Sequence, residues 1–295
     1  MVNLNRWINE VSDDTRVSKL SIPASHQSFC YHTALPSVQC QGASVTKQLE
    51  HGIRFLDVRL GRLFTGETKT DGLQVVHSKF PVKIPFPLKF KDALDDVYEF
   101  LSKNPSETVI VSIKQEGSDD WDNKNDEFGK VIWDQYVNPN KDKWYLGTDI
   151  PRVGDARGKI ILFRRFGVQD ENLRNQFGFD APFWQYNTTA DDRGHVVAQD
   201  FCEITSENLN DKVRYVKDFA KKAQEYNSTN DDKLFVNFTS GSNFFDKNCW
   251  PEPVSKAMVE GKIDESFHKG CGIIVLDYAE ANDWKLVKEL VNSNF

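Results

Sequence analysis

Short apolar segments with the length of β-strands recur along this chain of 295 residues and restrict the folds open to it. Several are almost unbroken apolar runs, such as "VIVSI" within Thr108–Lys114 and "GIIVL" within Gly272–Asp277. Such runs are typical of parallel strands, which are buried on both faces because helices cover each side of the sheet. The eight predicted strands are Leu20–Ile22, Arg54–Leu60, Leu73–His77, Thr108–Lys114, Lys159–Arg165, His195–Asp200, Leu234–Thr239 and Gly272–Asp277.

Amphipathic helices are predicted between several of these strands. In the segment 87–104, the apolar residues Leu94, Val97, Phe100 and Leu101 recur with the spacing of one helical face. The segments 211–226 and 284–291 repeat this pattern, and Val45–Gly52 is a shorter candidate in which Gly52 would be the C-cap.

Eight strands with helices between them favour a (βα)₈ barrel, and an open doubly wound sheet is the alternative. The glycine-rich phosphate-binding turn of open sheets is missing after the first predicted strand, which disfavours that alternative. No internal repeat or low-complexity linker divides the chain. We therefore predict a single α/β domain over residues 1–295.

Charge and composition limit the partners. The chain carries 37 lysines and arginines against 44 aspartates and glutamates, a formal net charge of −7. Nucleic acids and anionic lipids bind to surfaces with clustered positive charge. The excess of acidic residues therefore argues against a nucleic-acid partner and against purely electrostatic adhesion to a membrane. No apolar run of about 18 residues predicts a membrane span, and the first residues, "MVNLNRWINEVSDD", do not resemble a signal peptide. We expect a monomer that is cytoplasmic by default, with secretion and action at a membrane surface as the alternative.

The cysteines show no metal-site spacing. No C-x-x-C pair occurs among the five, which are Cys30, Cys40, Cys202, Cys249 and Cys271. Cys30 and Cys40 could bridge a loop, but free thiols are favoured. No cofactor is predicted.

Ionisable side chains stand at or just after most of the predicted strand ends. Barrel active sites form at the carboxyl ends of the strands, so we expect these side chains to converge on one cleft. Together they offer a base, an acid and fixed cations, which is the set that phosphoryl transfer needs. For any one of them alone, an ordinary polar strand end is the competing interpretation. The residues are His26, Arg59, His77, Lys114, Arg165, Asp200 and Asp277.

The same arrangement disfavours two other kinds of site. Calcium or magnesium would favour several carboxylates grouped together. The carboxylates expected at this edge, Asp57, Asp200 and Asp277, are instead interleaved with arginines and a lysine, so no metal site is predicted. A serine hydrolase is unsupported because no G-x-S-x-G motif occurs.

The motifs that carry these residues resemble those of the bacterial-type phosphatidylinositol-specific phospholipases C and their X-domain relatives. The resemblance covers nearly the whole chain, in the order and spacing of the family. It implies a distorted TIM-type (βα)₈ barrel that cleaves phosphatidylinositol or a related phospholipid to diacylglycerol and a cyclic inositol phosphate. The motifs are "SIPASHQS", "QLEHGIRFLDVRL", "VVHS", "ETVIVSIKQE", "RGKIILFRRF", "VVAQDFCE", "LFVNFTS" and "GIIVLDY".

The resemblance also implies roles for individual residues. His26 matches the general base, Asp277 the residue that orients it, and His77 the general acid. Arg59 matches the arginine that stabilises the phosphate. Calcium-dependent relatives carry a metal-binding acid at this position, so an arginine here implies the metal-independent branch of the family. The remaining matches are supporting roles for Gln27 and Asp57, inositol hydroxyl contacts for Lys114, Arg165 and Asp200, and an aromatic wall of the head-group pocket for Trp184.

Two positions depart from the family pattern. Gln27 replaces an aspartate or asparagine, and an amide cannot favour a protonated imidazole by charge. We therefore expect His77 to be less readily protonated here, and the enzyme to be weakened or tuned to a better leaving group. Cys202 replaces a common tyrosine that stacks on the inositol ring, which makes strict inositol specificity doubtful. These departures favour the alternative of a weakly active or inactive relative that binds inositol phosphates or phospholipid head groups.

Two loops at the expected catalytic face are rich in aromatic residues. They are "SKFPVKIPFPLKF" after His77 and "SGSNFFDKNCWPEP" after Leu234–Thr239. Aromatic rings with lysines nearby suit shallow insertion into a membrane surface, and packing on outer helices is the competing interpretation. The candidate membrane contacts are Phe80, Phe86, Phe244, Phe245 and Trp250.

Overall fold

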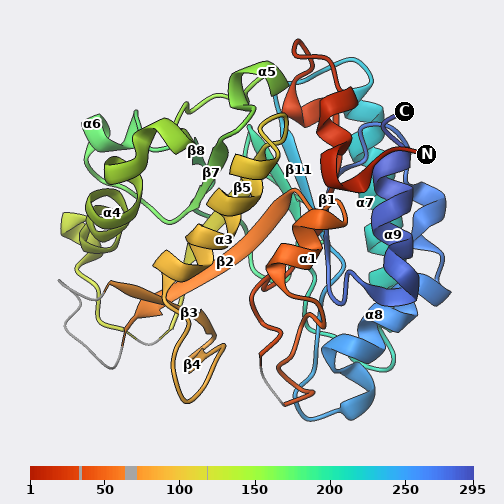
Figure 1. The fold of residues 1–295 in the computed structure, drawn as a ribbon. Coiled ribbons are helices and arrows are strands. Elements are labelled where there is room, and N and C mark those ends of the chain that lie inside the picture. The colour runs from red at the N-terminus through yellow and green to blue at the C-terminus, as the bar shows by residue number, and fades with distance from the viewer. Residues whose placement is uncertain (33–34, 64–71, 118) are drawn as a thin grey trace.

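A computed structural model describes residues 1–32, 35–63, 72–117 and 119–295 (Figure 1). Its centre is a strongly curled sheet with the strand order β6-β7-β5-β2-β1-β12-β11-β10-β9. All neighbours along this path are parallel except β10 and β9. The strands are β1 (Ser21–Ser25), β2 (Phe55–Arg62), β5 (Val109–Gln115), β6 (Trp144–Tyr145), β7 (Ile160–Arg165), β9 (Asp191–Asp192), β10 (Val196–Gln199), β11 (Leu234–Phe238) and β12 (Gly272–Leu276).

The first and last long strands are neighbours. β1 pairs with β12 in parallel from Ser21 opposite Gly272 to Ser25 opposite Leu276. The carboxyl ends of the two strands therefore lie side by side, although 251 positions separate His26 from Asp277. This pairing is what joins the two ends of the sequence into one site.

One predicted strand does not take the place expected for it. β3 (Leu73–His77) pairs with β2 antiparallel, with Leu60 opposite Val75, and then with β4 (Phe80–Pro81). The link from Arg62 to Leu73 is shorter than the dozen or more residues that a parallel crossover needs, so the chain turns back as a hairpin. The prediction of β3 as a parallel barrel strand is therefore wrong.

A short strand that was not predicted adds to the edge of the barrel wall. β8 (Phe179–Asp180) pairs in parallel with β7. Contacts of His195 link β8 to the chain that leads into β10: its ring lies 5.1 Å from that of Phe179, and its Nε2 contacts the carbonyl oxygen of Asp180.

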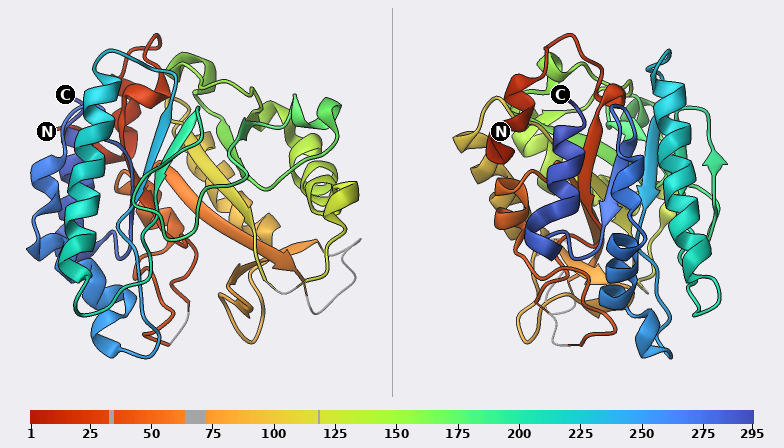
Figure 2. Two further views of the ribbon diagram at one scale, coloured as in Figure 1. Left: turned by 180° about the vertical axis from the view of Figure 1, so that it is seen from behind. Right: turned by 90° about the vertical axis from the view of Figure 1, so that its right-hand side faces the viewer.

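Helices cover the outside of the sheet (Figures 1 and 2). The predicted apolar stripe of Leu94, Val97, Phe100 and Leu101 is buried in α3, which confirms that prediction. The C-cap of α1 is His51, one residue before the predicted Gly52. Gly52 comes next, and its φ of +112° lies in a region that favours glycine. The α-helices are α1 (Val45–Glu50), α3 (Phe90–Lys103), α4 (Glu127–Ile132), α5 (Val153–Ala156), α6 (Glu171–Arg174), α7 (Leu209–Asn227), α8 (Pro251–Glu260) and α9 (Ala281–Asn292). In the described residues, no helix is both long and apolar enough to cross a membrane.

Shorter helical turns join these elements. A π-helical turn, η4 (Trp133–Val137), continues α4. The 3₁₀ turns are η1 (Leu4–Glu10), η2 (Val17–Lys19), η3 (Asn123–Asn125), η5 (Asn138–Lys143), η6 (Lys247–Cys249) and η7 (Ile263–Ser266).

A buried ion pair ties the N-terminal turn η1 to the amino-terminal end of the barrel. Arg54, just before β2, contacts Glu107, just before β5, at 2.9 Å, and both side chains are at most 1% exposed. The Glu107 carboxylate also accepts the backbone N–H groups of Ile8 and Asn9 in η1 and the hydroxyl of Ser106. Since both charges are paired and hydrogen-bonded, their burial is tolerated.

Candidate active site

β1 and β12 position the first pair of polar residues. His26 follows β1, and its backbone N–H donates to the carbonyl oxygen of Leu276 at 2.8 Å. Asp277 follows β12, and its Oδ1 lies 2.7 Å from His26 Nδ1. Gln41 fixes this edge, because its Nε2 donates to the carbonyl oxygens of both His26 and Leu276. When Nδ1–H of neutral His26 donates to the aspartate, Nε2 is left as the basic nitrogen.

Asp277 also controls the charge of His26. Burial lowers the pKa of this imidazole, but the charge of Asp277 and its hydrogen bond together outweigh burial and raise the pKa of His26 above 6.5. Arg59 opposes this rise and Asp57 adds to it. A histidine with this balance accepts a proton readily near neutral pH, as a general base must.

β2 contributes a buried ion pair. Arg59 Nη2 lies 3.1 Å from Asp57 Oδ2, which also accepts the backbone N–H of Gln27 at 3.0 Å. Burial favours the neutral form of Asp57, but the charge of Arg59 overrides it and holds the pKa of Asp57 well below its usual range. Burial likewise lowers the pKa of Arg59, but Asp57 and then Glu116, 3.5 Å away, raise it, so the guanidinium stays charged.

Three cations lie at one level on neighbouring strands. The register places Arg59 of β2 opposite Lys114 of β5, and Lys114 opposite Arg165 of β7. Their side chains therefore leave the same face of the sheet. Burial, followed by the charge of Arg59, lowers the pKa of Lys114 to about 8 and the pKa of Arg165 to about 10. An anion bound among these groups would relieve their mutual repulsion.

Trp184 and Asp200 contact each other beside these cations. Trp184 Nε1 donates to Asp200 Oδ2 at 3.0 Å, and the Arg165 guanidinium lies 3.8 Å from the centre of the Trp184 ring. The ring of Phe238 lies 6.0 Å from that of Trp184 and 6.2 Å, edge-on, from that of His26. Contacts between side chains therefore run from Asp200 to His26.

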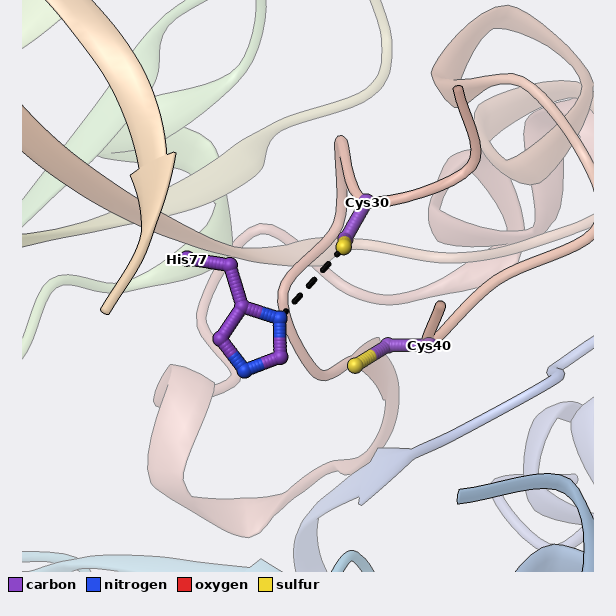
Figure 3. A group of neighbouring side chains, drawn as sticks. All are labelled: Cys30, Cys40 and His77. Atoms are coloured by element: carbon purple, nitrogen blue, oxygen red, sulfur yellow. Dashed lines mark hydrogen bonds between the residues drawn. The ribbon is translucent and has the colours of Figure 1, made fainter. Parts of the chain in front are cut away.

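His77 lies at the end of β3, in contact with Cys30 and close to Cys40 (Figure 3). Its Nδ1 is 3.5 Å from Cys30 Sγ, and one ligand atom each of Cys30, Cys40 and His77 lies within 4.8 Å of the others. Cys40 belongs to a second such group with His26 and Asp277. Cys40 therefore lies between the two histidines to which the family resemblance gives the base and acid roles.

Gln27, the residue directly after His26, is buried. It is 2% exposed, its φ of +43° is left-handed, and its carbonyl oxygen accepts the backbone N–H of Cys30. Its side-chain Nε2 has no hydrogen-bond partner among the described residues. An aspartate at this position would have no side-chain N–H to bury without a partner. The glutamine that departs from the family pattern therefore lowers the stability of the folded protein locally.

Residues 14–166, more than half of the chain, match the family described as phosphatidylinositol-specific phospholipase C, X domain. This chain belongs to that family. The 1-phosphatidylinositol phosphodiesterase of Listeria monocytogenes is 26% identical to it over 308 residues, which cover 99% of this chain and 86% of that protein. The protein of the same name from Staphylococcus aureus strain Newman is 27% identical over 314 residues, covering 98% of this chain and 93% of that protein.

A solved structure confirms the fold of this X-domain chain. The phosphatidylinositol-specific phospholipase C of Staphylococcus aureus with incorporated pentafluoro-Phe superposes with a TM-score of 0.82 at 23% identity, covering 99% of this chain and 98% of that one. The TIM-type barrel that the sequence predicts is therefore confirmed, with β3 as the exception described above.

Several residues of this X-domain site were not found from sequence. Glu116 follows β5 and contacts Arg59. The sequence feature that could have indicated Glu116 as a site residue is its position directly after the strand segment "VSIKQ". Gln41 and the Cys30–Cys40 pair lie where the chain returns from a loop, and no local pattern predicts that return. The five cysteines are free thiols, as the sequence favours.

The candidate membrane residues of the X-domain chain are mostly exposed. Phe80 begins β4, and Phe86 follows that strand. Phe245, the most exposed of the set at 95%, lies beside Phe244 before α8. Trp250 is partly buried, and its Nε1 donates to the carbonyl oxygen of Phe244. The β4 hairpin and the chain before α8 extend from the same end of the molecule (Figures 1 and 2).

Proposed function

We propose that this X-domain protein is a metal-independent phospholipase C that cleaves phosphatidylinositol-type lipids. The observation that carries the proposal is the His26–Asp277 pair in one network with the aligned cations Arg59, Lys114 and Arg165. A general base beside fixed positive charge matches the two needs of phosphodiester cleavage, which are an activated hydroxyl and a stabilised phosphorane-like charge. The name shared by the two bacterial relatives supports phosphatidylinositol as the substrate class.

The first step forms a cyclic phosphate. His26 Nε2 takes the proton of the inositol 2-hydroxyl, and the hydroxyl oxygen bonds to phosphorus. The bond from phosphorus to the diacylglycerol oxygen breaks, and His77 gives that oxygen a proton. Because the nucleophile belongs to the substrate, neither a serine nor a metal-bound water is required.

The second step opens the ring with water. His77 now takes a proton from the water, whose oxygen bonds to phosphorus, and His26 returns a proton to the inositol 2-oxygen. Asp277 holds His26 in the productive tautomer in both steps. Arg59 supports the charge on the phosphate, and Asp57 fixes the Arg59 fork.

Head-group binding is assigned to the polar wall beside the cations. Lys114, Arg165 and Asp200 offer donors and acceptors for inositol hydroxyls, and Trp184 offers a ring face that Arg165 already stacks on. The exposed rings of Phe80, Phe86, Phe244 and Phe245, with Trp250, would rest in the membrane surface while the lipid enters. These roles together describe a peripheral enzyme that meets its substrate at a bilayer.

Release of diacylglycerol from vesicles tests this function. Wild-type protein should release diacylglycerol from phosphatidylinositol vesicles but not from phosphatidylcholine vesicles. Arg59→Lys should lower kcat by about 10²–10³-fold, because one ammonium replaces a two-point fork at the phosphate. Arg62→Lys is the matched control: Arg62 lies on the same strand but pairs with Glu127, so its activity should match wild type. Equal activity of the Arg59 and Arg62 variants would refute the assigned role.

A second candidate is a weakly active relative that binds inositol phosphates or phospholipid head groups. The observation that favours it is the buried Nε2 of Gln27, which has no hydrogen-bond partner among the described residues, although the backbone N–H of Gln27 donates to Asp57. Calorimetry with inositol phosphate and a product assay distinguish the two candidates. Binding without release of diacylglycerol would favour this candidate, and turnover would exclude it.

A further inference from the structure

Two thiols and an imidazole form a preorganised cluster that the reaction above does not use as a unit. Cys30 follows the turn after β1, and Cys40 ends the loop that begins there. The backbone N–H groups of Cys40 and Gln41 both donate to the carbonyl oxygen of Cys30, at 3.1 and 3.2 Å. Both thiols also contact one carbonyl oxygen, that of Val38, at 3.4 and 3.3 Å. The backbone therefore holds the two sulfur atoms together.

His77 completes the cluster from another element. Its Nδ1 lies 3.5 Å from Cys30 Sγ, and Figure 3 shows both sulfur atoms directed toward its ring. Zinc–sulfur bonds of about 2.3 Å and zinc–nitrogen bonds of about 2.0–2.1 Å at a tetrahedral angle put ligand atoms about 3.5 Å apart. The edge from Cys30 to His77 already has this length, and Cys40 lies within 4.8 Å of both.

We propose that Cys30, Cys40 and His77 form an inhibitory site for Zn²⁺ with one coordination position left open. The donors are soft thiolates and an imidazole, which prefer zinc to calcium or magnesium. Each thiol that enters as S–H releases its proton to solvent, and no electron transfer takes place. Cys30 and Cys40 are 1% and 0% exposed, so the metal would be bound inside the protein.

Zinc in this site would stop the proposed reaction. His77 bound through Nδ1 keeps a proton on Nε2 but can no longer be an imidazolium, so it cannot protonate the diacylglycerol oxygen. Cys40 also belongs to the group with His26 and Asp277, so the ion would lie next to the proposed base. This inhibitory effect rests on the proposed function, whereas the binding of the metal does not.

Cobalt spectroscopy tests binding without any turnover. Reduced full-length protein should bind one equivalent of Co²⁺ with a thiolate-to-cobalt charge-transfer band that Zn²⁺ abolishes. Cys30→Ser, Cys40→Ser and His77→Gln should each weaken binding by more than the roughly 10–100-fold typical of an outer-shell partner. Cys271→Ser, which removes a buried thiol directly before β12, should keep the band. Circular dichroism of each variant checks the fold, and the partly exposed His77 provides a test even where a buried cysteine variant does not fold.

The inhibition assay follows on the same proteins. Zn²⁺ should inhibit release of diacylglycerol by the wild type, a chelator should restore it, and Cys40→Ser should lose the sensitivity. No charge-transfer band in the reduced protein, or a band unchanged in Cys30→Ser, would overturn the site. Cys30–Cys40 crosslinking under mild oxidation without any cobalt band would show a redox pair instead and would also overturn it. Zinc binding without inhibition would leave the site but refute its inhibitory role.

Discussion

In the proposed reaction, Asp277 sets the pH at which His26 can act as the base. In the folded protein, its charge and hydrogen bond outweigh burial and raise the pKa of His26. The base is active only when deprotonated, so a higher pKa moves the rising limb of the rate profile to higher pH. Orientation and charge are thus supplied by the same residue.

Asp277→Asn should separate these contributions. Without the carboxylate, burial and Arg59 would lower the pKa of His26, so the rising limb of kcat/KM against pH should move to lower pH. The maximal rate should still fall, by about 10²–10⁴-fold, because the tautomer is no longer fixed. Measuring kcat/KM from pH 5 to 9 provides the test, and a rising limb that stays in place or moves upward would contradict it.

Gln27→Asp tests the main departure from the family pattern. A carboxylate at this buried position would remove the Nε2 donor that has no partner among the described residues, and the family resemblance implies that its charge would support His77 as the acid. We expect a higher rate, with the falling limb of the pH profile moved to higher pH. An unchanged rate and profile would refute the idea that Gln27 weakens the enzyme. Gln39→Glu, a partly exposed site in the neighbouring loop, is a charge-matched control.

The sequence predicts the position in the fold of some site residues but not of others. His26 and Asp277 follow their strands, Arg165 ends β7, and Lys114 is the last but one residue of β5. Arg59 lies within β2, which continues to Arg62 beyond its predicted end, but the register still aligns it with Lys114 and Arg165. Their catalytic roles remain predictions. The neighbours of His77 were not predicted, because its contact with Cys30 depends on the path of a loop that carries no periodic signal.

At the scale of elements, the length of a connection decides between a crossover and a hairpin. The apolar run "LQVV" reads as a parallel strand, but the short link from Arg62 forces β3 to pair antiparallel with β2. The loop after His77 is consequently carried on a hairpin, and β4, with the exposed Phe80 and the following Phe86, extends from one end of the molecule.

The chain before α8 supplies the second aromatic loop. Replacing Phe244 and Phe245 by serine should weaken binding to phosphatidylinositol vesicles by about ten- to a hundredfold, since even partial burial of two rings contributes ~1.5–3 kcal/mol. Hydrolysis of a soluble inositol phosphate ester should be unaffected. Vesicle sedimentation measures binding, and Phe295→Ser, exposed at the C-terminus, is the control. Equal losses on vesicles and on the soluble ester would contradict membrane contact.

A buried acid, Glu107, contributes to holding the N-terminal turn η1 against the barrel. Glu107→Ala would leave Arg54 charged and unpaired in the interior and free two N–H groups of η1. We expect a loss of about 3–5 kcal/mol in the free energy of unfolding. Denaturant unfolding measures it, with Glu99→Ala as the control, because the Glu99–Lys103 pair is exposed and such pairs contribute about 0–1 kcal/mol. Equal losses in both variants would contradict the account of this ion pair.

For the whole molecule, the class of fold follows from the sequence, whereas the composition of the barrel wall does not. Buried runs and amphipathic helices predict the α/β barrel, and the likeness to the Staphylococcus aureus enzyme confirms it. The two-residue strand β8 is too short to leave a period in the sequence, so its place beside β7 could not be predicted.

The central claim is that side chains alone drive attack by the substrate's own hydroxyl. Phosphorus NMR of phosphatidylinositol turnover in excess chelator tests it most directly. We predict that a cyclic inositol phosphate signal appears first and then decays to the acyclic phosphate, at a rate that the chelator does not reduce. Direct appearance of the acyclic phosphate, or loss of turnover in chelator that added metal restores, would contradict the account.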